Sequence, residues 1–314
     1  MTGPVLVVMR PLPFPVLRAN GEEIEVRQFG GDFSVFEGAT VLCSIVLDVI
    51  DANFIAALPD SVKLIANIGT GYDRIDIDAA TDRGIRVTNT PIVAEDTADL
   101  TLLLILAAAR QLTANQKFLR GRLWTSTQQP TQIGKTVHGT TLGIIGFGEI
   151  GQAVARRAKG FNMNVIYHGP RRKPAAEERV GATYFKTLED MLATADIVSL
   201  HCPLTEQTKH IINAQTLSAM KSDAVLVNTG RGALIDEAAF VDSMKAGHLS
   251  GAGLDVFEYE PDMHLGLLEL DNITLTPHIG AATAQCHSLI GACAIENILA
   301  QFEGRELISC VNPH

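Results

Sequence analysis

The sequence contains little of what characterises membrane, secreted or nucleic-acid-binding proteins. Its longest apolar stretch, residues 100–109, is too short to cross a bilayer. The first 15 residues place no basic region before their apolar patch, so they do not resemble a signal peptide. With 25 Lys and Arg against 35 Asp and Glu, the net charge of −10 argues against nucleic acid as a partner. We therefore expect a cytoplasmic protein that binds neither membranes nor nucleic acid.

Cysteine is also sparse, and its spacing excludes two kinds of site. The five cysteines, at positions 43, 202, 286, 293 and 310, form no CxxC pair and show no His/Cys spacing of a zinc site. Their odd number is simplest to explain as reduced thiols, so we expect no metal. The rest of the composition, 46% hydrophobic and 19% charged with 27 glycines, is that of a globular enzyme. A length of 314 residues suggests about two domains.

A glycine-rich segment stands between a short apolar run, residues 142–145, and a helical pattern. It reads Gly146-x-Gly148-x-x-Gly151. The first glycine lets the chain turn sharply, the second lets a pyrophosphate approach the amides at the helix N-terminus, and the third lets the helix lie close to the sheet. A chance glycine cluster would lack the strand before it and the helix after it. The segment therefore predicts dinucleotide binding.

The next strand, residues 164–167, ends without the acidic residue that usually binds the adenosine ribose about 20 residues after the glycines. His168 stands there, and Arg171, Arg172 and Lys173 follow. This loop suits a 2′-phosphate, because no carboxylate repels it and a guanidinium can bind it through paired hydrogen bonds. The sequence therefore predicts that NADP(H) is preferred over NAD(H). The alternative is an ordinary solvated basic loop.

The first 95 residues or so alternate apolar runs with helical segments, which predicts an α/β unit with a parallel sheet. The expected strands are residues 5–9, 23–26, 41–46, 62–68 and 85–88. A glycine-rich loop, residues 69–73, follows the fourth of them. It is either an ordinary turn or a set of amides that faces the carboxylate of a small acid.

A long helix is expected from Ala94 to about Gln111, with Asp96 or Thr97 as its cap. It would carry the chain from the first domain into the second. The only tryptophan, Trp124, follows in a polar stretch. Two interpretations stay open: Trp124 marks an interface, or it packs on its own domain.

Polar side chains follow the later expected strands, residues 195–200, 224–228, 251–256 and 273–276, along one rim of one sheet. Three of them have useful chemistry. Arg231 has a planar fork that suits a carboxylate, His278 is a candidate proton donor, and Glu260 is a carboxylate that could orient a histidine. Each alone is more typical of an ordinary loop, as an exposed arginine, an exposed glutamate or a hydrogen-bonded histidine, and the sequence does not show that they meet.

These motifs resemble the D-isomer-specific 2-hydroxyacid dehydrogenase family, and within it the NADPH-preferring glyoxylate and hydroxypyruvate reductases. Four segments in order carry the resemblance: the run from Gly146, and residues 228–232, 253–261 and 276–280. It extends over nearly the whole chain and is weakest in residues 10–40. It implies two doubly wound parallel-sheet α/β domains, with a Rossmann cofactor domain inserted in a flavodoxin-like substrate domain. The implied bounds are 1–97 and 286–314 for the substrate domain and 98–285 for the dinucleotide-binding domain.

The resemblance also implies residue roles. Arg231 would bind the carboxylate and carbonyl of the substrate, His278 would protonate the carbonyl oxygen, and Glu260 would hold and polarise His278. Asp255, helped by the Thr229 backbone, would bind the nicotinamide carboxamide. The implied cofactor-binding residues are Thr97, Gly146, Gly148, Glu149, Ile150, Gly151, His168, Arg171, Arg172, Cys202, Pro203, Thr229, Gly230, Asp255 and Gly280. Ile68 and Gly69, with Arg231, would bind the substrate.

Departures from the family narrow the expectation. Relatives that use formate have glutamine in place of Glu260, and many phosphoglycerate dehydrogenases have a regulatory extension that this sequence lacks. We therefore expect a reductase that moves hydride from NADPH to a small anionic 2-oxo acid, such as glyoxylate or hydroxypyruvate, in a homodimer formed through the cofactor domains. One alternative is a nucleotide-binding, corepressor-like interaction protein. Another is a reductase of a different 2-oxo acid, such as 2-ketogluconate or phenylpyruvate.

Overall fold

The computed structural model describes residues 3–130 and 132–312, which form two compact units. Unit 1 comprises Met1–Val93 and Thr283–His314, and unit 2 comprises Ala94–Ala282. Unit 2 is thus inserted into unit 1, as the fold class expected from the sequence requires. The chain passes between the units at residues 93 and 283, where the resemblance implied 97 and 286.

Unit 1 is built on a parallel sheet of five strands in the order β4-β1-β5-β6-β7. Taken in chain order this is 2-1-3-4-5, the flavodoxin-like order. The strands are β1 (Val5–Val8), β4 (Glu25–Gln28), β5 (Val41–Ile45), β6 (Leu64–Ile68) and β7 (Arg86–Thr88). The run expected at residues 23–26 is instead divided. Its start belongs to a small antiparallel hairpin of β2 (Arg18–Ala19) and β3 (Glu22–Glu23), which closes through Asn20-Gly21, both at positive φ.

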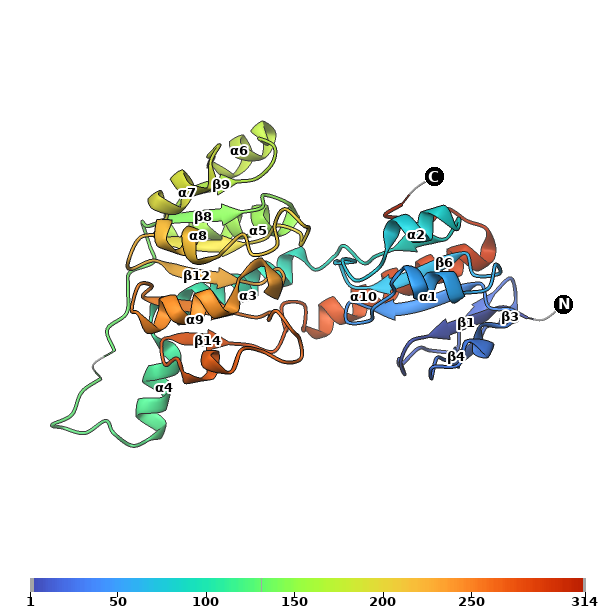
Figure 1. Cartoon of the computed structure of the whole chain (residues 1–314), viewed down its shortest axis with the longest axis horizontal. Coiled ribbons are helices and arrows are strands. Elements are labelled where there is room, and N and C mark those ends of the chain that lie inside the picture. Colours follow the sequence, from blue (N-terminus) through green and yellow to red (C-terminus); the bar gives the residue numbers. More distant parts are fainter. Residues whose placement is uncertain (1–2, 131, 313–314) are drawn as a thin grey trace. The chain divides into compact units, whose positions relative to one another are not determined.

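The helices of unit 1 cover both faces of this sheet (Figure 1). They are η1 (Phe33–Phe36), α1 (Ala52–Ala57), α2 (Ile77–Asp82) and α10 (Ala284–Glu303). Asp32, Asp51, Asp76 and Thr283 cap their N-termini with side-chain oxygens. The last helix comes from the far end of the chain and packs on β6, so the two segments of unit 1 share one core.

Unit 2 contains a parallel sheet of seven strands in the order β10-β9-β8-β11-β12-β13-β14. The first six have the 3-2-1-4-5-6 order of a Rossmann fold. The strands are β8 (Thr141–Ile145), β9 (Asn164–His168), β10 (Ala182–Tyr184), β11 (Ile197–Leu200), β12 (Val225–Asn228), β13 (Gly251–Leu254) and β14 (Ile273–Leu275). The sequence analysis missed β10, because only Ala182 of its three residues is buried and no apolar run marks the strand.

Two apolar clusters, one on each face, hold the helices of unit 2 to the sheet. These helices are α3 (Ala94–Ala109), α4 (Leu112–Arg120), α5 (Glu149–Ala158), η2 (Lys159–Phe161), α6 (Pro174–Val180), α7 (Leu188–Thr194), α8 (Ala214–Ala219), η3 (Gly232–Leu234), α9 (Glu237–Lys245) and η4 (Leu265–Glu269). The core helix α3 packs on α5, β12 and β13.

The expected cap of the long helix was wrong. The helix α3 begins at Ala94, so Asp96 and Thr97 lie inside its first turn. It ends at Ala109, and Gln111 at positive φ starts α4 in a new direction. In the described part of the chain no single helix is long and apolar enough to cross a membrane. The pair α3 and α4 passes that test by length and composition, but it is bent by 64° and α3 is largely buried.

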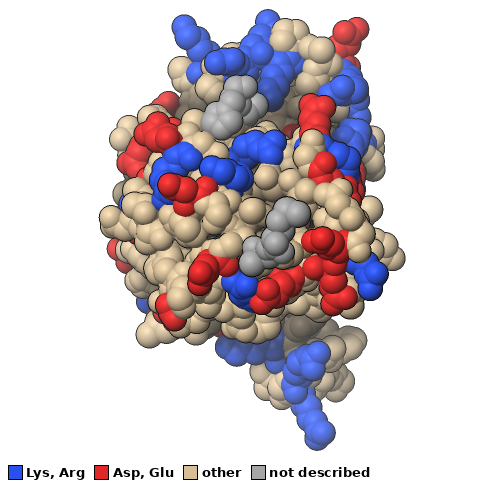
Figure 2. Space-filling view, turned by 90° about the vertical axis from the view of Figure 1, so that its right-hand side faces the viewer, with Lys and Arg blue, Asp and Glu red and all other residues tan. Residues whose placement is uncertain are grey.

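Beyond α3, the helix α4 with residues 121–130 and 132–133 forms an arm that extends away from the sheet of unit 2 (Figure 1). On the face drawn in Figure 2, acidic and basic side chains are interspersed across the middle, and basic side chains gather toward the upper part.

One buried side chain, Asn312, contributes three of the hydrogen bonds that fix the C-terminal segment to unit 1. The Asn312 Oδ1 accepts a hydrogen bond from the Val87 N–H at 2.7 Å, and its Nδ2 donates to the Ile85 carbonyl at 3.0 Å and to Thr81 Oγ1 at 2.9 Å. We predict that Asn312→Ala lowers the free energy of unfolding by about 1–3 kcal/mol, because buried backbone groups lose their partners. Denaturant unfolding followed by circular dichroism measures this. Asn53→Ala, on an exposed position of α1, is the control and should cause no loss. Equal stability of the two variants would contradict the role of Asn312.

Candidate active site

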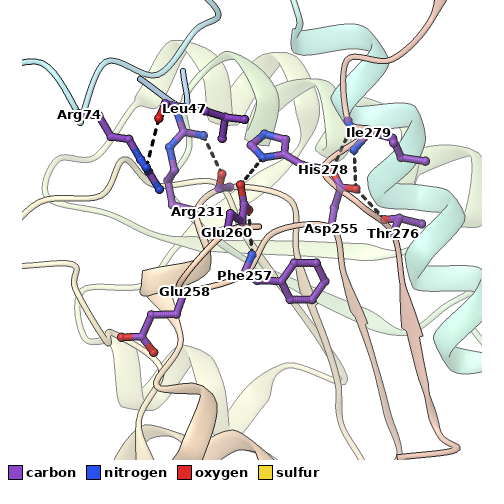
Figure 3. Close-up of polar contacts among 12 residues, drawn as sticks. Leu47, Arg74, Arg231, Asp255, Phe257, Glu258, Glu260, Thr276, His278 and Ile279 are labelled. Atoms are coloured by element: carbon purple, nitrogen blue, oxygen red, sulfur yellow. Dashed lines mark hydrogen bonds and ion pairs between the residues drawn. The ribbon is translucent and has the colours of Figure 1, made fainter. Parts of the chain in front are cut away.

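Three chemically useful side chains meet at the carboxyl edge of the unit 2 sheet (Figure 3). Arg231 follows β12, Glu260 lies in the loop after β13, and His278 lies in the loop after β14. Because these strands are parallel neighbours, their following loops must leave the sheet at the same edge. The structure thus brings together the three residues that the sequence could only place on one rim.

Glu260 and His278 form a hydrogen-bonded pair. The distance from His278 Nδ1 to Glu260 Oε2 is 2.8 Å, and Glu260 Oε1 accepts a further bond from the Phe257 N–H at 2.9 Å. Burial acts to raise the pKa of Glu260, but the bond to His278, its charge, the Phe257 amide and the charge of Arg231 outweigh burial and lower it. The carboxylate therefore stays ionised at neutral pH, and this fixes the proton of the imidazole on Nδ1 and leaves Nε2 for chemistry.

The loop that carries Arg231 is set by a close backbone approach. A Cβ on Gly232 would lie 1.8 Å from the Phe257 carbonyl carbon, so only glycine lets the turn after β12 lie against the loop that carries Glu260. The Asn228 side chain closes the turn by donating to the Arg231 carbonyl at 2.8 Å and accepting from the Gly230 N–H at 3.0 Å. The Arg231 guanidinium is half-buried and donates to the Gly230 carbonyl at 2.9 Å.

The loop that carries His278 is held by the Asp255 carboxylate, which is 1% exposed. It accepts hydrogen bonds from Thr276 Oγ1 at 2.7 Å and from the Ile279 and Gly280 amides, each at 2.8 Å. Burial raises the pKa of Asp255, and these three bonds partly oppose the effect. His278 itself has a positive φ of 53°, a conformation that these bonds and its own N–H bond to the Asp255 carbonyl impose.

Threonines from α3 line the same region of unit 2. A Cβ on Gly280 would lie 3.5 Å from Thr97 Oγ1 and 3.2 Å from Asp255 Oδ2, so these three expected cofactor residues are neighbours. Thr101 Oγ1 donates to the Thr97 carbonyl and is 2.8 Å from Thr229 Oγ1. Thr101 was missed from the sequence, although its spacing of four from Thr97 places both on one helix face.

The glycine motif fits a dinucleotide pyrophosphate. Gly146 has a φ of 92°, and a Cβ there would lie 2.4 Å from the Cys202 amide nitrogen; a Cβ on Gly151 would lie 2.3 Å from the Gly146 carbonyl oxygen. Both glycines are therefore required by the fold itself. A Cβ on Gly148 would meet nothing within 4 Å, so the protein leaves open the space that a pyrophosphate needs. Gly148 is the N-cap of α5 and gives its first turn, which contains Glu149 and Ile150, no side-chain cap.

The loop after β9 differs from its sequence-based description in one respect. His168 ends the strand, with its Nδ1 3.1 Å from the Phe185 carbonyl oxygen, and the exposed Arg171 side chain forms no hydrogen bond or ion pair with the described residues. Arg172, in contrast, is paired with Glu177 of α6, and Glu177 is bonded to the buried Tyr167. The sequence analysis treated Arg171 and Arg172 as equivalent, and it did not find Glu177 or Tyr167.

The expected cofactor residues Cys202 and Pro203 lie in the loop after β11, next to the glycine motif. Burial raises the pKa of the Cys202 thiol to about 11, so the thiol is unreactive at neutral pH. Burial also lowers the pKa of His201 to about 3, and this neutral imidazole has its Nε2 2.7 Å from Ser199 Oγ. The side chains of Cys202 and His201 therefore shape the surface next to the glycine motif without adding a charge to it.

In unit 1, the expected substrate-binding residues Ile68 and Gly69 lie at the carboxyl end of β6. The Gly69 N–H donates to Thr90 Oγ1 at 2.8 Å, and the Asn67 side chain donates to the Gly71 carbonyl at 2.9 Å, so the loop is held by side chains. A role for these two amides toward a substrate carboxylate stays a prediction. Across the described residues, no group of three or more His, Cys, Asp or Glu is placed to hold a metal ion.

Comparison with known proteins gives a consistent result. Residues 102–280 match the family model described as D-isomer specific 2-hydroxyacid dehydrogenase, NAD binding domain. A glyoxylate reductase of Thermococcus litoralis is 44% identical over 276 residues, which cover 86% of this chain and 83% of that relative.

Two solved structures extend the likeness over the whole chain. An NADPH-dependent glyoxylate/hydroxypyruvate reductase of Sinorhizobium meliloti, in complex with NADP and malonate, has a TM-score of 0.86 at 31% identity, over 98% of this chain and 96% of that chain. A D-lactate dehydrogenase of Aquifex aeolicus, complexed with NAD and lactic acid, has a TM-score of 0.86 at 27% identity, over 99% and 100%. With Arg231, Glu260 and His278 at the sheet edge that also carries a dinucleotide loop, the chain belongs to the D-isomer specific 2-hydroxyacid dehydrogenase family and is an NAD(P)-dependent dehydrogenase of 2-hydroxy acids.

Proposed function

We propose that this enzyme reduces a small 2-oxo acid of the glyoxylate or hydroxypyruvate type to the D-2-hydroxy acid, with NADPH as the reductant. The observation that carries the proposal is the His278–Glu260 pair beside Arg231, at the sheet edge that also carries the glycine motif. The names of the Thermococcus and Sinorhizobium relatives support the substrate class. In this proposal 2-ketogluconate and phenylpyruvate are the competing substrates.

When bound, the reduced dinucleotide supplies a hydride to the carbonyl carbon of the substrate. The enzyme must then give a proton to the carbonyl oxygen. His278 Nε2–H donates that proton, so that one hydride and one proton complete the alcohol. Glu260 accepts the Nδ1–H bond throughout and stabilises the imidazolium before transfer, because an ionised carboxylate favours the charged ring.

Arg231 and Asp255 orient the two reactants. The Arg231 fork binds the substrate carboxylate and polarises the carbonyl oxygen. The Asp255 carboxylate accepts three bonds from the loop after β14. Because a carboxylate has about four acceptor positions, one remains for the nicotinamide carboxamide, with Thr229 beside it.

We predict that His278→Ala lowers kcat by about 10²-fold or more, the usual scale of general acid catalysis, with little change in cofactor affinity. Steady-state kinetics with glyoxylate, hydroxypyruvate, 2-ketogluconate and phenylpyruvate would measure this and rank the substrates by kcat/KM. His138→Ala is the control, because this exposed histidine precedes β8 at the opposite edge of the same sheet. A His278→Ala enzyme with wild-type kcat would remove the residue from the mechanism, and a higher kcat/KM for phenylpyruvate would overturn the substrate class.

The preference for NADPH is inferred from the loop after β9. His168 leaves no acidic side chain at the end of the strand, and Arg171 and Arg172 follow it on the exposed surface. The Sinorhizobium relative, with NADP bound, supports this inference, whereas the Aquifex relative binds NAD. The inference that this loop binds the 2′-phosphate of NADPH therefore rests on the charge and hydrogen-bond geometry of these two arginines.

We predict that replacing both Arg171 and Arg172 by alanine raises KM for NADPH by about tenfold or more and leaves KM for NADH nearly unchanged, since only NADPH has a 2′-phosphate. The measurement is the ratio of kcat/KM for NADPH to kcat/KM for NADH. Added salt should lower this ratio in the wild type, because the site is exposed and its charges are screened. Arg110→Ala, a change of one exposed cation near the start of β13, is the control. An unaltered ratio in the double variant would show that specificity is set elsewhere.

A symmetric homodimer through unit 2 is proposed from the arm, which is α4 with residues 121–130 and 132–133. Its apolar side chains are exposed on the single chain: Trp124 is 61% and Ile133 89% exposed, and Leu119 and Leu123 are exposed as well. A hollow of about 210 Å³ lies at the base of the arm between α4 and Pro130. An extended arm with an exposed apolar surface is typical of a contact between the subunits of an oligomer.

We predict that Trp124→Ala combined with Ile133→Asp converts the protein from dimer to monomer at micromolar concentration, because the interface loses apolar area and gains a buried charge. Sedimentation velocity decides it. Val16→Asp changes an equally exposed apolar residue in unit 1 and should leave the dimer intact. A monomeric wild type would end the dimer proposal.

A further inference from the structure

The two arginines after β9 are in different situations. The Arg172 guanidinium lies side-on against the Glu177 carboxylate, with Nε 3.0 Å from both oxygens and Nη2 2.8 Å from Oε2. The Glu177 side chain is 10% exposed, whereas that of Arg172 is 65% exposed. Arg171 has no such partner among the described residues. One of the two cations is therefore held by a buried carboxylate and the other is not.

Glu177 is in turn held from below by Tyr167. The Tyr167 hydroxyl donates to Glu177 Oε1 at 2.7 Å and accepts from the Lys173 N–H at 2.7 Å. Burial and the neighbouring Glu177 raise the pKa of Tyr167 to about 12, so this hydroxyl remains a donor at neutral pH. The Tyr167 ring is fully buried and stacks on Phe147, with centroids 4.1 Å apart and planes at 15°.

Phe147 stands between Gly146 and Gly148 of the glycine motif. One continuous set of contacts therefore runs from the pyrophosphate loop through Phe147, Tyr167 and Glu177 to Arg172. The cofactor-binding role proposed above involves only the two ends of this set, the glycine motif and Arg172. The residues in the middle, Tyr167 and Glu177, have no assigned task.

The side-on pairing leaves part of the guanidinium available. It engages the Nε–H and one Nη2–H of Arg172, and a guanidinium has five N–H donors in a rigid fork. Both Nη1 donors and one Nη2 donor remain, and they lie on the side of the group that faces away from Glu177. That edge is suited to two parallel bonds to a phosphate.

We propose that Glu177, held by Tyr167, is a positioning residue for cofactor choice: it orients Arg172 so that the free edge of its guanidinium meets the ribose 2′-phosphate. This inference rests on the proposed preference for NADPH. A long side chain that is already fixed loses less conformational freedom when it binds. Glu177 therefore strengthens the contact of a phosphate with Arg172 without touching the phosphate.

A second effect of Glu177 has the opposite sign. Its negative charge repels a phosphate, so removing the charge alone would strengthen phosphate binding. We expect orientation to dominate, because the paired charges of Glu177 and Arg172 largely cancel and solvent screens what remains at this exposed surface. Glu178, the next residue of α6, is exposed and has the same charge, so it provides a matched control for the charge effect.

The test compares the binding of adenosine 2′,5′-bisphosphate, which has the 2′-phosphate, with that of 5′-AMP, which lacks it. Titration calorimetry on the full-length enzyme needs no turnover. Glu177→Gln should weaken binding of the bisphosphate by roughly threefold to tenfold and leave 5′-AMP unchanged, since one side chain loses its orientation. Tyr167→Phe keeps the ring on Phe147 and removes the hydroxyl, so it should act in the same direction to a smaller extent. Glu178→Gln should change neither affinity.

The possible outcomes are separable. Unchanged or tighter bisphosphate binding in Glu177→Gln overturns the inference, and so does an equal loss for both ligands, which would mark a purely structural role. The wild type and Arg171→Ala test the cofactor proposal itself. If the wild type binds both ligands equally and Arg171→Ala changes nothing, the preference for NADPH fails whatever Glu177 does. If Arg171→Ala lowers the ratio of bisphosphate affinity to 5′-AMP affinity and Glu177→Gln does not, only the positioning role of Glu177 fails.

Discussion

The catalytic end of this enzyme depends on one buried carboxylate. Asp255 lies at the end of β13 and accepts three hydrogen bonds, all from the loop that follows β14. A buried charge is tolerated only when it is bonded in this way, so the loop has one conformation in which the charge is satisfied. That conformation places His278 at positive φ with its ring against Glu260. The position of His278, the proposed proton donor, is thus set by a group that does not itself donate the proton.

Much of this arrangement follows from patterns that the sequence displays. Parallel strands with apolar runs and the glycine motif predict the fold, and the order of the motifs predicts that Arg231, Glu260 and His278 share one edge. The short strand β10 and the hairpin of β2 and β3 were missed because most of their residues are exposed or half-buried, so no apolar run marks them. The cap of α3 was misplaced because Asp and Thr are also acceptable inside a first turn.

The contacts of individual side chains could not be predicted, for reasons of spacing. Arg172 and Glu177 are five residues apart, and α6 begins between them at Pro174, so no helical or strand period relates the two. The bonds of Asp255 to residues 276–280 join positions that are more than 20 apart in sequence, and only the pairing of β13 with β14 brings them together. The acceptor for the Gly69 amide, Thr90, is likewise on a neighbouring strand end. Tertiary structure decides each of these contacts.

The order of the strands separates cofactor choice from chemistry. The loop proposed to contact the adenosine ribose follows β9, whereas His278 follows β14. Five strand-to-strand steps lie between them in the sheet. At ~4.8 Å a step, this amounts to roughly 24 Å. The glycine motif after β8 lies between the two, where a pyrophosphate joins the halves of a dinucleotide. Over such a distance an exposed arginine at one end exerts little screened electrostatic effect on a proton donor at the other. If the surface loop sets the preference between NADPH and NADH, as proposed, that preference can change while Asp255, Glu260 and His278 keep their geometry.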